Sequence, residues 1–264
     1  GYNVSDNGIY TPSIGDVVRG TTATYVAQDG TIKTAQPNVA RVDYTNGVAE
    51  LLLEPSSTNL VTYSEDFSQW LGTPTFVSLN DSISPSGEYN ACRLTMGANQ
   101  FFYCPSNAPS GEVVTSSIYI NGVQGETITL EAGGFYVTHT LSGGWERIIS
   151  TGTSVGTSIS LNTYGGVTAR NFLVWGGQME LGSTATSYIP TNGATATRSA
   201  DSLTNFGSSQ IIDSNSGILF LEGSVLTNDS DAKIITLINN SYAQGLGASM
   251  YFVGSNLRAD MWVE

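Results

Sequence analysis

Short runs in which apolar and polar residues alternate recur along most of this chain. Such alternation over about four to eight residues is typical of strands that bury one face. Gly, Pro, Asn or Ser residues separate most of the runs, and no stretch between them has the period of roughly 3.6 residues that marks an amphipathic helix. The pattern predicts an all-β protein built from many short strands.

The strand candidates are densest between residues 55 and 191. They are NLVTY, TFVSL, ACRLTM, QFFYC, VVTSSIYI, ETITLEA, FYVTHTL, WERIIST, TSISLNT and RNFLVWGGQMEL. This spacing predicts an antiparallel jelly-roll β-sandwich over residues 55–191. A solenoid is the alternative, but the sequence has no fixed repeat period.

Residues 1–54 predict extended strands that form a connector without a core of its own. Asp29-Gly30 and Asn46-Gly47 are tight-turn signals within it. Glu54-Pro55 ends the apolar run Leu51–Leu53, which favours a structural junction over an active site. We expect these strands to associate with identical chains, as a homotrimer; the alternative is that they fold back on the jelly roll of the same chain.

Residues 192–215 are polar and predict a linker. A second alternating pattern fills residues 216–264, with the runs GILFLEGSV, KIITLIN, ASMYFVG and LRADMWV. It predicts the start of a second, incomplete β-sandwich. Because the last run stops without a closing turn, we expect the sequence to be part of a longer protein.

Charge narrows the classes of partner. Nine basic against 22 acidic residues give a net charge of −13, which opposes binding to nucleic-acid phosphates. No run of about 18 apolar residues is present, so no membrane insertion is expected. The carboxylates suit either a structural Ca²⁺ site or ordinary solubility.

Two stretches together carry a resemblance to a known family. NVARVDYTNGVAELLLEPSSTNLVTYSEDFSQW and FLVWGGQMELGSTATSYIPTNGATATRSAD resemble the two ends of a module found in phage and prophage tail-fibre or minor structural proteins. The resemblance covers roughly residues 15–201. It implies a jelly roll similar to carbohydrate-binding modules, followed by a concanavalin-like or laminin-G-like sandwich beginning near Ser216.

The resemblance implies a non-enzymatic structural protein at the virion surface, in a fibre or another appendage. Its expected partners are identical chains, other virion proteins and a host-surface glycan. One alternative is the carbohydrate-binding appendage of a polysaccharide depolymerase whose catalytic domain lies beyond Glu264. Another alternative is a secreted bacterial adhesin.

Candidate catalytic groups are sparse, and we assign none. Glu65 and Asp66 are adjacent, so in a strand they would point to opposite faces and could not flank a sugar as a glycosidase pair does. His139 is the one histidine, and it lies in an alternating run, where we expect an ordinary sheet residue. The Gly-Gly pairs predict turns or, at Gly176-Gly177, a bulge in the last strand.

Two cysteines lie symmetrically in CRLTMGANQFFYC. A hairpin turning at Gly97-Ala98-Asn99 would place Cys92 opposite Cys104, where a disulfide is a candidate. Assembly in a reducing cytoplasm makes two buried thiols the alternative.

Sugar binding by a jelly roll needs aromatic faces that can stack on a pyranose. In QFFYC, Phe101 and Tyr103 share one face of a strand and Phe102 takes the other, so one face must carry aromatic side chains away from the core. Phe101, Tyr103 and Trp70 are the candidate carbohydrate-binding residues.

The candidate Ca²⁺ site follows from what jelly rolls resembling this one often hold near their first and last strands. Glu65 and Asp66 follow the first strand, and Gln178 and Glu180 lie in the last. Pairing of the two strands would gather their oxygens, which are the ligands that Ca²⁺ prefers. The alternative is that Asp66 caps a turn before Trp70 and Glu180 faces water.

Overall fold

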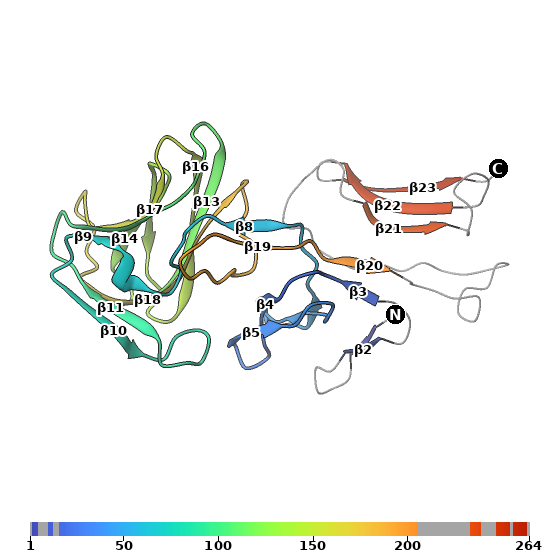
Figure 1. Ribbon diagram of the computed structural model, residues 1–264, viewed down its shortest axis with the longest axis horizontal. Coiled ribbons are helices and arrows are strands. Elements are labelled where there is room, and N and C mark those ends of the chain that lie inside the picture. Colours follow the sequence, from blue (N-terminus) through green and yellow to red (C-terminus); the bar gives the residue numbers. More distant parts are fainter. Residues whose placement is uncertain are drawn as a thin grey trace. The chain divides into compact units, whose positions relative to one another are not determined.

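The computed structural model describes residues 16–204 together with five separate strands. These strands are β1 (Tyr2–Val4), β2 (Tyr10–Pro12), β21 (Lys233–Ile238), β22 (Gly247–Val253) and β23 (Asn256–Trp262). The chain divides into two compact units, residues 1–217 and 218–264 (Figure 1).

Two five-stranded antiparallel sheets form the centre of the first unit (Figure 1). One sheet has the order β10-β11-β18-β13-β16, and its strands are β10 (Phe76–Ser82), β11 (Ala91–Thr95), β13 (Val113–Asn121), β16 (Glu146–Thr153) and β18 (Asn171–Leu181). The other has the order β15-β14-β17-β12-β9, and its strands are β9 (Leu71–Gly72), β12 (Phe101–Pro105), β14 (Thr127–Ala132), β15 (Phe135–Thr140) and β17 (Ser158–Asn162). The predicted all-β, antiparallel jelly-roll sandwich is confirmed.

The core lies between these sheets and is filled by alternate residues of each strand. Leu94 and Val174 come from one sheet, and Leu130 and Leu161 from the other; all four are 0% exposed. Because side chains of a strand point alternately to its two faces, each run of alternating residues in the sequence becomes one inward row.

The longest strand, β18, contains the predicted bulge. Its register with β13 shifts between Ser117 and Tyr119, and Gly176 has φ +65°, a conformation that favours glycine. A Cβ on Gly177 would lie 2.7 Å from the Trp70 ring, so a side chain there would displace the indole. The two glycines therefore bend the strand and admit a large core residue.

The N-terminal segment consists of short strands joined by tight turns. These strands are β3 (Asp16–Val18), β4 (Ala23–Val26), β5 (Ile32–Ala35), β6 (Val42–Asp43), β7 (Glu50–Leu51) and β8 (Ser57–Asn59). Gly30, with φ +80°, turns β4 into β5, and Gly47, with φ +77°, turns β6 into β7. Both predicted turns are confirmed.

These N-terminal strands fold back on the sandwich of the same chain. Ile32 and Val26 pack with Trp175, Tyr119 and neighbouring aromatic residues against the β10-β11-β18-β13-β16 sheet. The alternative stated for this segment is therefore the one observed. The homotrimer was predicted because these strands were expected to lack a core, and their packing on the sandwich removes that reason. The oligomeric state stays a prediction that light scattering can test.

The predicted linker, residues 192–215, contains two strands in its described part. β19 (Ala196–Arg198) pairs with β8, and β20 (Ser202–Thr204) pairs with β3. The N-terminal strands and the segment after β18 thus pair with each other in two-stranded antiparallel sheets.

The described strands of the second unit form an antiparallel sheet in the order β21-β22-β23. They coincide with three of the predicted runs, and the run GILFLEGSV lies outside the described residues. The concanavalin-like sandwich from residue 216 stays a prediction. In the described residues no helix is long or apolar enough to cross a membrane, and the helical element there is the 3-10 turn η1 (Phe67–Gln69).

The predicted hairpin between the cysteines is wrong. β11, with Cys92, pairs with β10 and β18, whereas β12, with Cys104, pairs with β9 and β17 in the opposite sheet. Each cysteine is 1% exposed and carries a free thiol, so the stated alternative of two buried thiols is the arrangement observed. Burial raises the pKa of Cys92 to about 12.

We expect both thiols to be unreactive in the folded protein. Thiolate is the reactive form, and burial both lowers its population and blocks access. An aromatic disulfide reagent at pH 8 should titrate no thiol before denaturation and both thiols in guanidinium chloride. Titration of neither thiol after denaturation without reductant would instead indicate a disulfide.

Candidate functional site

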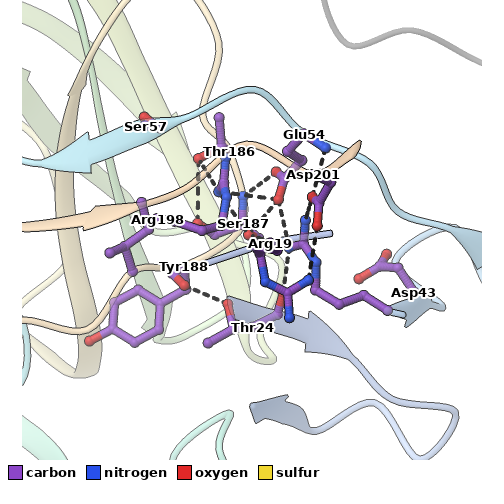
Figure 2. A network of polar contacts seen from close by, with 12 residues as sticks. Arg19, Thr24, Asp43, Glu54, Ser57, Thr186, Ser187, Tyr188, Arg198 and Asp201 are labelled. Carbon is purple, nitrogen blue, oxygen red and sulfur yellow. Dashed lines mark hydrogen bonds and ion pairs between the residues drawn. The ribbon is translucent and has the colours of Figure 1, made fainter. Parts of the chain in front are cut away.

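A network of charged side chains lies buried where the N-terminal strands meet the segment after β18 (Figure 2). Arg41 Nη1 lies 2.7 Å from Glu54 Oε2, and Arg41 Nη2 donates to Asp201 Oδ2. Arg19 Nη1 lies 2.9 Å from Asp201 Oδ1. Arg198 Nη1 lies 3.1 Å from Glu54 Oε2. These side chains are at most 1% exposed, so their charges are compensated by one another rather than by water.

The carboxylates of this network are saturated with donors. Ser187 donates to Glu54 from its backbone N at 2.7 Å and from its Oγ at 2.6 Å. Glu54 N donates to Asp201 Oδ2 at 2.9 Å. The buried Glu180 adjoins the network and accepts from Ser57 Oγ at 2.6 Å. These carboxylates accept hydrogen bonds from several chain segments and so hold those segments together.

The two stretches that carry the family resemblance meet in this network. Arg41 and Glu54 belong to the first stretch, and Ser187, Arg198 and Asp201 belong to the second. Burial lowers the pKa of Arg198, and the charge of Glu54 opposes that shift. At the predicted structural junction, Glu54 thus links the N-terminal strands to the segment after β18 through buried ion pairs and hydrogen bonds.

Two of the four predicted Ca²⁺ ligands lie before and at the start of η1. Asp66 Oδ1 accepts from Ser68 N at 3.1 Å and caps the turn, which is the alternative stated for it. Glu65 Oε1 accepts from the Tyr188 hydroxyl at 2.9 Å, and Glu65 Oε2 accepts from Asn90 Nδ2 at 3.2 Å. Burial raises the pKa of Glu65.

The other two lie in β18 and are buried. Gln178 Oε1 accepts from Ile189 N at 2.6 Å. Glu180 is 0% exposed and accepts from Thr186 N at 3.0 Å, so the alternative that it faces water is wrong. No group of three or more His, Cys, Asp or Glu side chains within the described residues is arranged to hold a metal ion. The Ca²⁺ site stays a prediction.

Trp70 does not present its ring to a ligand. It is 4% exposed, its Nε1 donates to Tyr63 O at 2.8 Å, and its ring packs 5.5 Å from that of Phe102. A buried indole with a satisfied N–H is a core residue. The assignment of Trp70 to sugar binding is therefore wrong.

Phe101 and Tyr103 lie where alternation predicts, on the side of the β15-β14-β17-β12-β9 sheet that faces away from the core, here called the outer face. Phe102 and Cys104 point inward and are buried, whereas Phe101 and Tyr103 are half-buried, with ring centroids 5.8 Å apart. The N-terminal strands pack against the other sheet. The aromatic pair is thus partly open to solvent.

Strand register aligns further side chains with this pair. One row across the outer face runs in the order Tyr136, Glu131, Ser160, Tyr103 and Leu71. Tyr136 is 57% and Leu71 51% exposed, while Glu131 and Ser160 between them are 7% and 4% exposed. Small or retracted polar residues therefore lie between larger apolar or aromatic ones.

The adjacent row contains Thr138, Thr129, Asn162 and Phe101. Asn162 is 2% exposed, and its Nδ2 has no hydrogen-bond partner within the described structure. A buried amide without a partner costs free energy, and such groups are often explained by a ligand or water. Sequence reasoning missed Asn162, Glu131 and Tyr136, because only the strand order brings them beside Phe101.

Two other positions are less suited to binding. A recess between β4 and the segment after β18 is lined by threonines, by apolar residues such as Ile189, and by Arg198, whose guanidinium already contacts Glu54. His139 lies in β15 opposite Ile128 as an ordinary sheet residue, and burial lowers its pKa. Of these features the outer face alone combines accessible aromatic rings with an unpartnered polar group.

Comparison with solved structures gives distant matches. A family 4 carbohydrate-binding module is 13% identical, with a TM-score of 0.33, covering 46% of this chain and 85% of that one. The CBM22-1–GH10 modules of Clostridium thermocellum xylanase 10B are 13% identical, with a TM-score of 0.34, covering 52% and 30%. The enzymatically active domain of bacteriophage CBA120 tailspike protein 4 is 11% identical, with a TM-score of 0.33, covering 46% and 21%.

No family model and no curated protein match the chain. The structural similarities are too distant to assign a ligand, and the outer face is therefore interpreted from its own residues.

Proposed function

We propose that this chain binds a glycan on the outer face and does so without catalysis. The observation that carries the proposal is the half-buried pair Phe101 and Tyr103 beside the unpartnered amide of Asn162. A pyranose offers an apolar face for stacking and hydroxyl groups for hydrogen bonds. On the outer face, the aromatic pair can stack on the apolar face of the sugar, and the Asn162 amide can donate a hydrogen bond to a hydroxyl group.

The dimensions of the outer face suit a chain of sugars. Tyr103 on β12 and Tyr136 on β15 are separated by β17 and β14. Three interstrand spacings place their backbones about 14 Å apart. The short or retracted side chains of Ser160 and Glu131 lie between them, which leaves room for a ligand to contact aromatic rings on both sides.

Removing either ring of the aromatic pair should weaken glycan binding. We expect Phe101→Ala and Tyr103→Ala each to reduce affinity by about tenfold or more, because aromatic contacts dominate small interfaces. The measurement is a glycan array followed by calorimetry on the strongest ligand. Phe76→Ala and Tyr89→Ala are matched controls, since both rings are exposed but lie on or beside β10 of the other sheet. Equal losses in controls and test variants would argue against the outer face.

The proposal extends to a role on the virion surface, as part of a phage fibre or another appendage that contacts a host glycan. Its support is the resemblance of both ends of the module, in order, to phage structural proteins. Antibody labelling of intact particles tests this role. Sustained release of reducing ends from host polysaccharide by the full-length protein would favour a depolymerase appendage instead.

A further inference from the structure

We infer that the glycan taken by the outer face is uncharged, and that Glu131 is the residue that excludes acidic sugars. This inference rests on the proposed function and specifies its ligand class. At the outward positions of the five strands of this sheet, Glu131 is the one charged residue.

Glu131 is held in place at the centre of the outer face. Its Oε1 accepts from Gly134 N at 2.8 Å and from Ser158 Oγ at 3.1 Å, and the side chain is 7% exposed. These neutral donors fix the carboxylate without neutralising its charge, and no salt bridge to it is found among the described residues. A fixed, poorly hydrated negative charge repels a second anion more strongly than a charge in water does.

The charge of Glu131 reaches the exposed part of the outer face. It is the main cause that raises the pKa of Tyr136, the neighbouring residue in β15, which is 57% exposed. A carboxylate on a sugar stacked near Tyr136 or Tyr103 would meet the same field. The hydroxyl groups of an uncharged sugar would instead donate hydrogen bonds to side-chain oxygens of the outer face and accept one from Asn162 Nδ2.

The test compares neutral hexose polysaccharides with their own derivatives oxidised to carboxylates at C6. These pairs share a backbone and differ in charge. The best neutral ligand should bind the full chain about tenfold or more tightly than its oxidised form. Raising the salt concentration should narrow this ratio, because screening weakens like-charge repulsion.

The variant Glu131→Gln keeps the Oε1 acceptor and removes the charge. Relative to the neutral polysaccharide, we expect this variant to bind the oxidised form several times more tightly than wild type does. Glu88→Gln, which makes the same charge change on an exposed loop between β10 and β11, is the matched control for the net charge of −13. It should leave the ratio unchanged.

Two results would overturn the inference. One is that the oxidised ligand binds wild type as tightly as its parent does. The other is that Glu131→Gln and Glu88→Gln shift the ratio equally; if Glu131→Gln does not fold, a wild-type ratio that is independent of salt takes the place of this second result. Failure of wild type to bind any polysaccharide is a separate result, because it rejects the proposed function itself and the inference with it.

Discussion

Replacing Arg41 with methionine is expected to lower the free energy of unfolding by about 3 to 5 kcal/mol. The guanidinium contacts Glu54 and Asp201, and Nη1 also donates to Thr24 O and Ser187 Oγ, each at 2.9 Å. Without this guanidinium, the negative charges of Glu54 and Asp201 are buried without full compensation. Urea denaturation followed by tryptophan fluorescence measures the change.

Arg93→Met is the matched control for this prediction. Arg93 Nε lies 2.7 Å from Asp81 Oδ1, but the two side chains are 36% and 25% exposed. Solvated pairs of this kind contribute about 1 kcal/mol or less. Similar losses in the two variants would mean that the buried network stabilises the chain no more than a surface ion pair.

A fragment of residues 55–191, the jelly roll predicted from sequence, is expected not to fold cooperatively, whereas residues 16–204 should fold. The shorter fragment lacks β19, the partner of β8, and lacks Ile32, which packs with Trp175 and Tyr188. Uncovering each large aromatic side chain costs about 1.5 to 3 kcal/mol, against a total stability of roughly 5 to 15 kcal/mol.

Near-ultraviolet circular dichroism during heating distinguishes the outcomes. The longer fragment should lose its aromatic signal in one sharp transition, and the shorter one should show little signal at any temperature. A cooperative melt of residues 55–191 within about 5 °C of the longer fragment would show that the N-terminal strands are dispensable for the sandwich.

Local features of the fold were predictable because few residue pairs satisfy them. Asp29-Gly30 and Asn46-Gly47 place glycine where φ is positive, and both turns form. The path between Cys92 and Cys104 was not predictable from the same reasoning. Alternation identifies the residues that face the core, but it does not say from which sheet they face it. Both cysteines face the core from opposite sheets, so the pattern also fitted a hairpin.

The candidate site divides in the same way. Phe101 and Tyr103 were found from three consecutive aromatic residues, because one strand decides their direction. Glu131 and Asn162 needed the order β12-β17-β14, which no short-range pattern contains. The assignment of Trp70 was wrong because its N–H donates to the Tyr63 carbonyl, and only the turn at η1 brings these two groups together.

The ion pair between Arg19 and Asp201 sets an order of events during synthesis. Its partners lie 182 residues apart. A ribosome adding roughly 5 to 20 residues per second therefore needs roughly 10 to 40 s after Arg19 before Asp201 is added. Until then Arg19 lacks the carboxylate with which it pairs in the folded chain, whereas Arg41 already has Glu54, which lies 13 residues after it. β3 and β8 likewise lack their partner strands β20 and β19 until that point, so the N-terminal segment completes its pairing only after the sandwich has been synthesised.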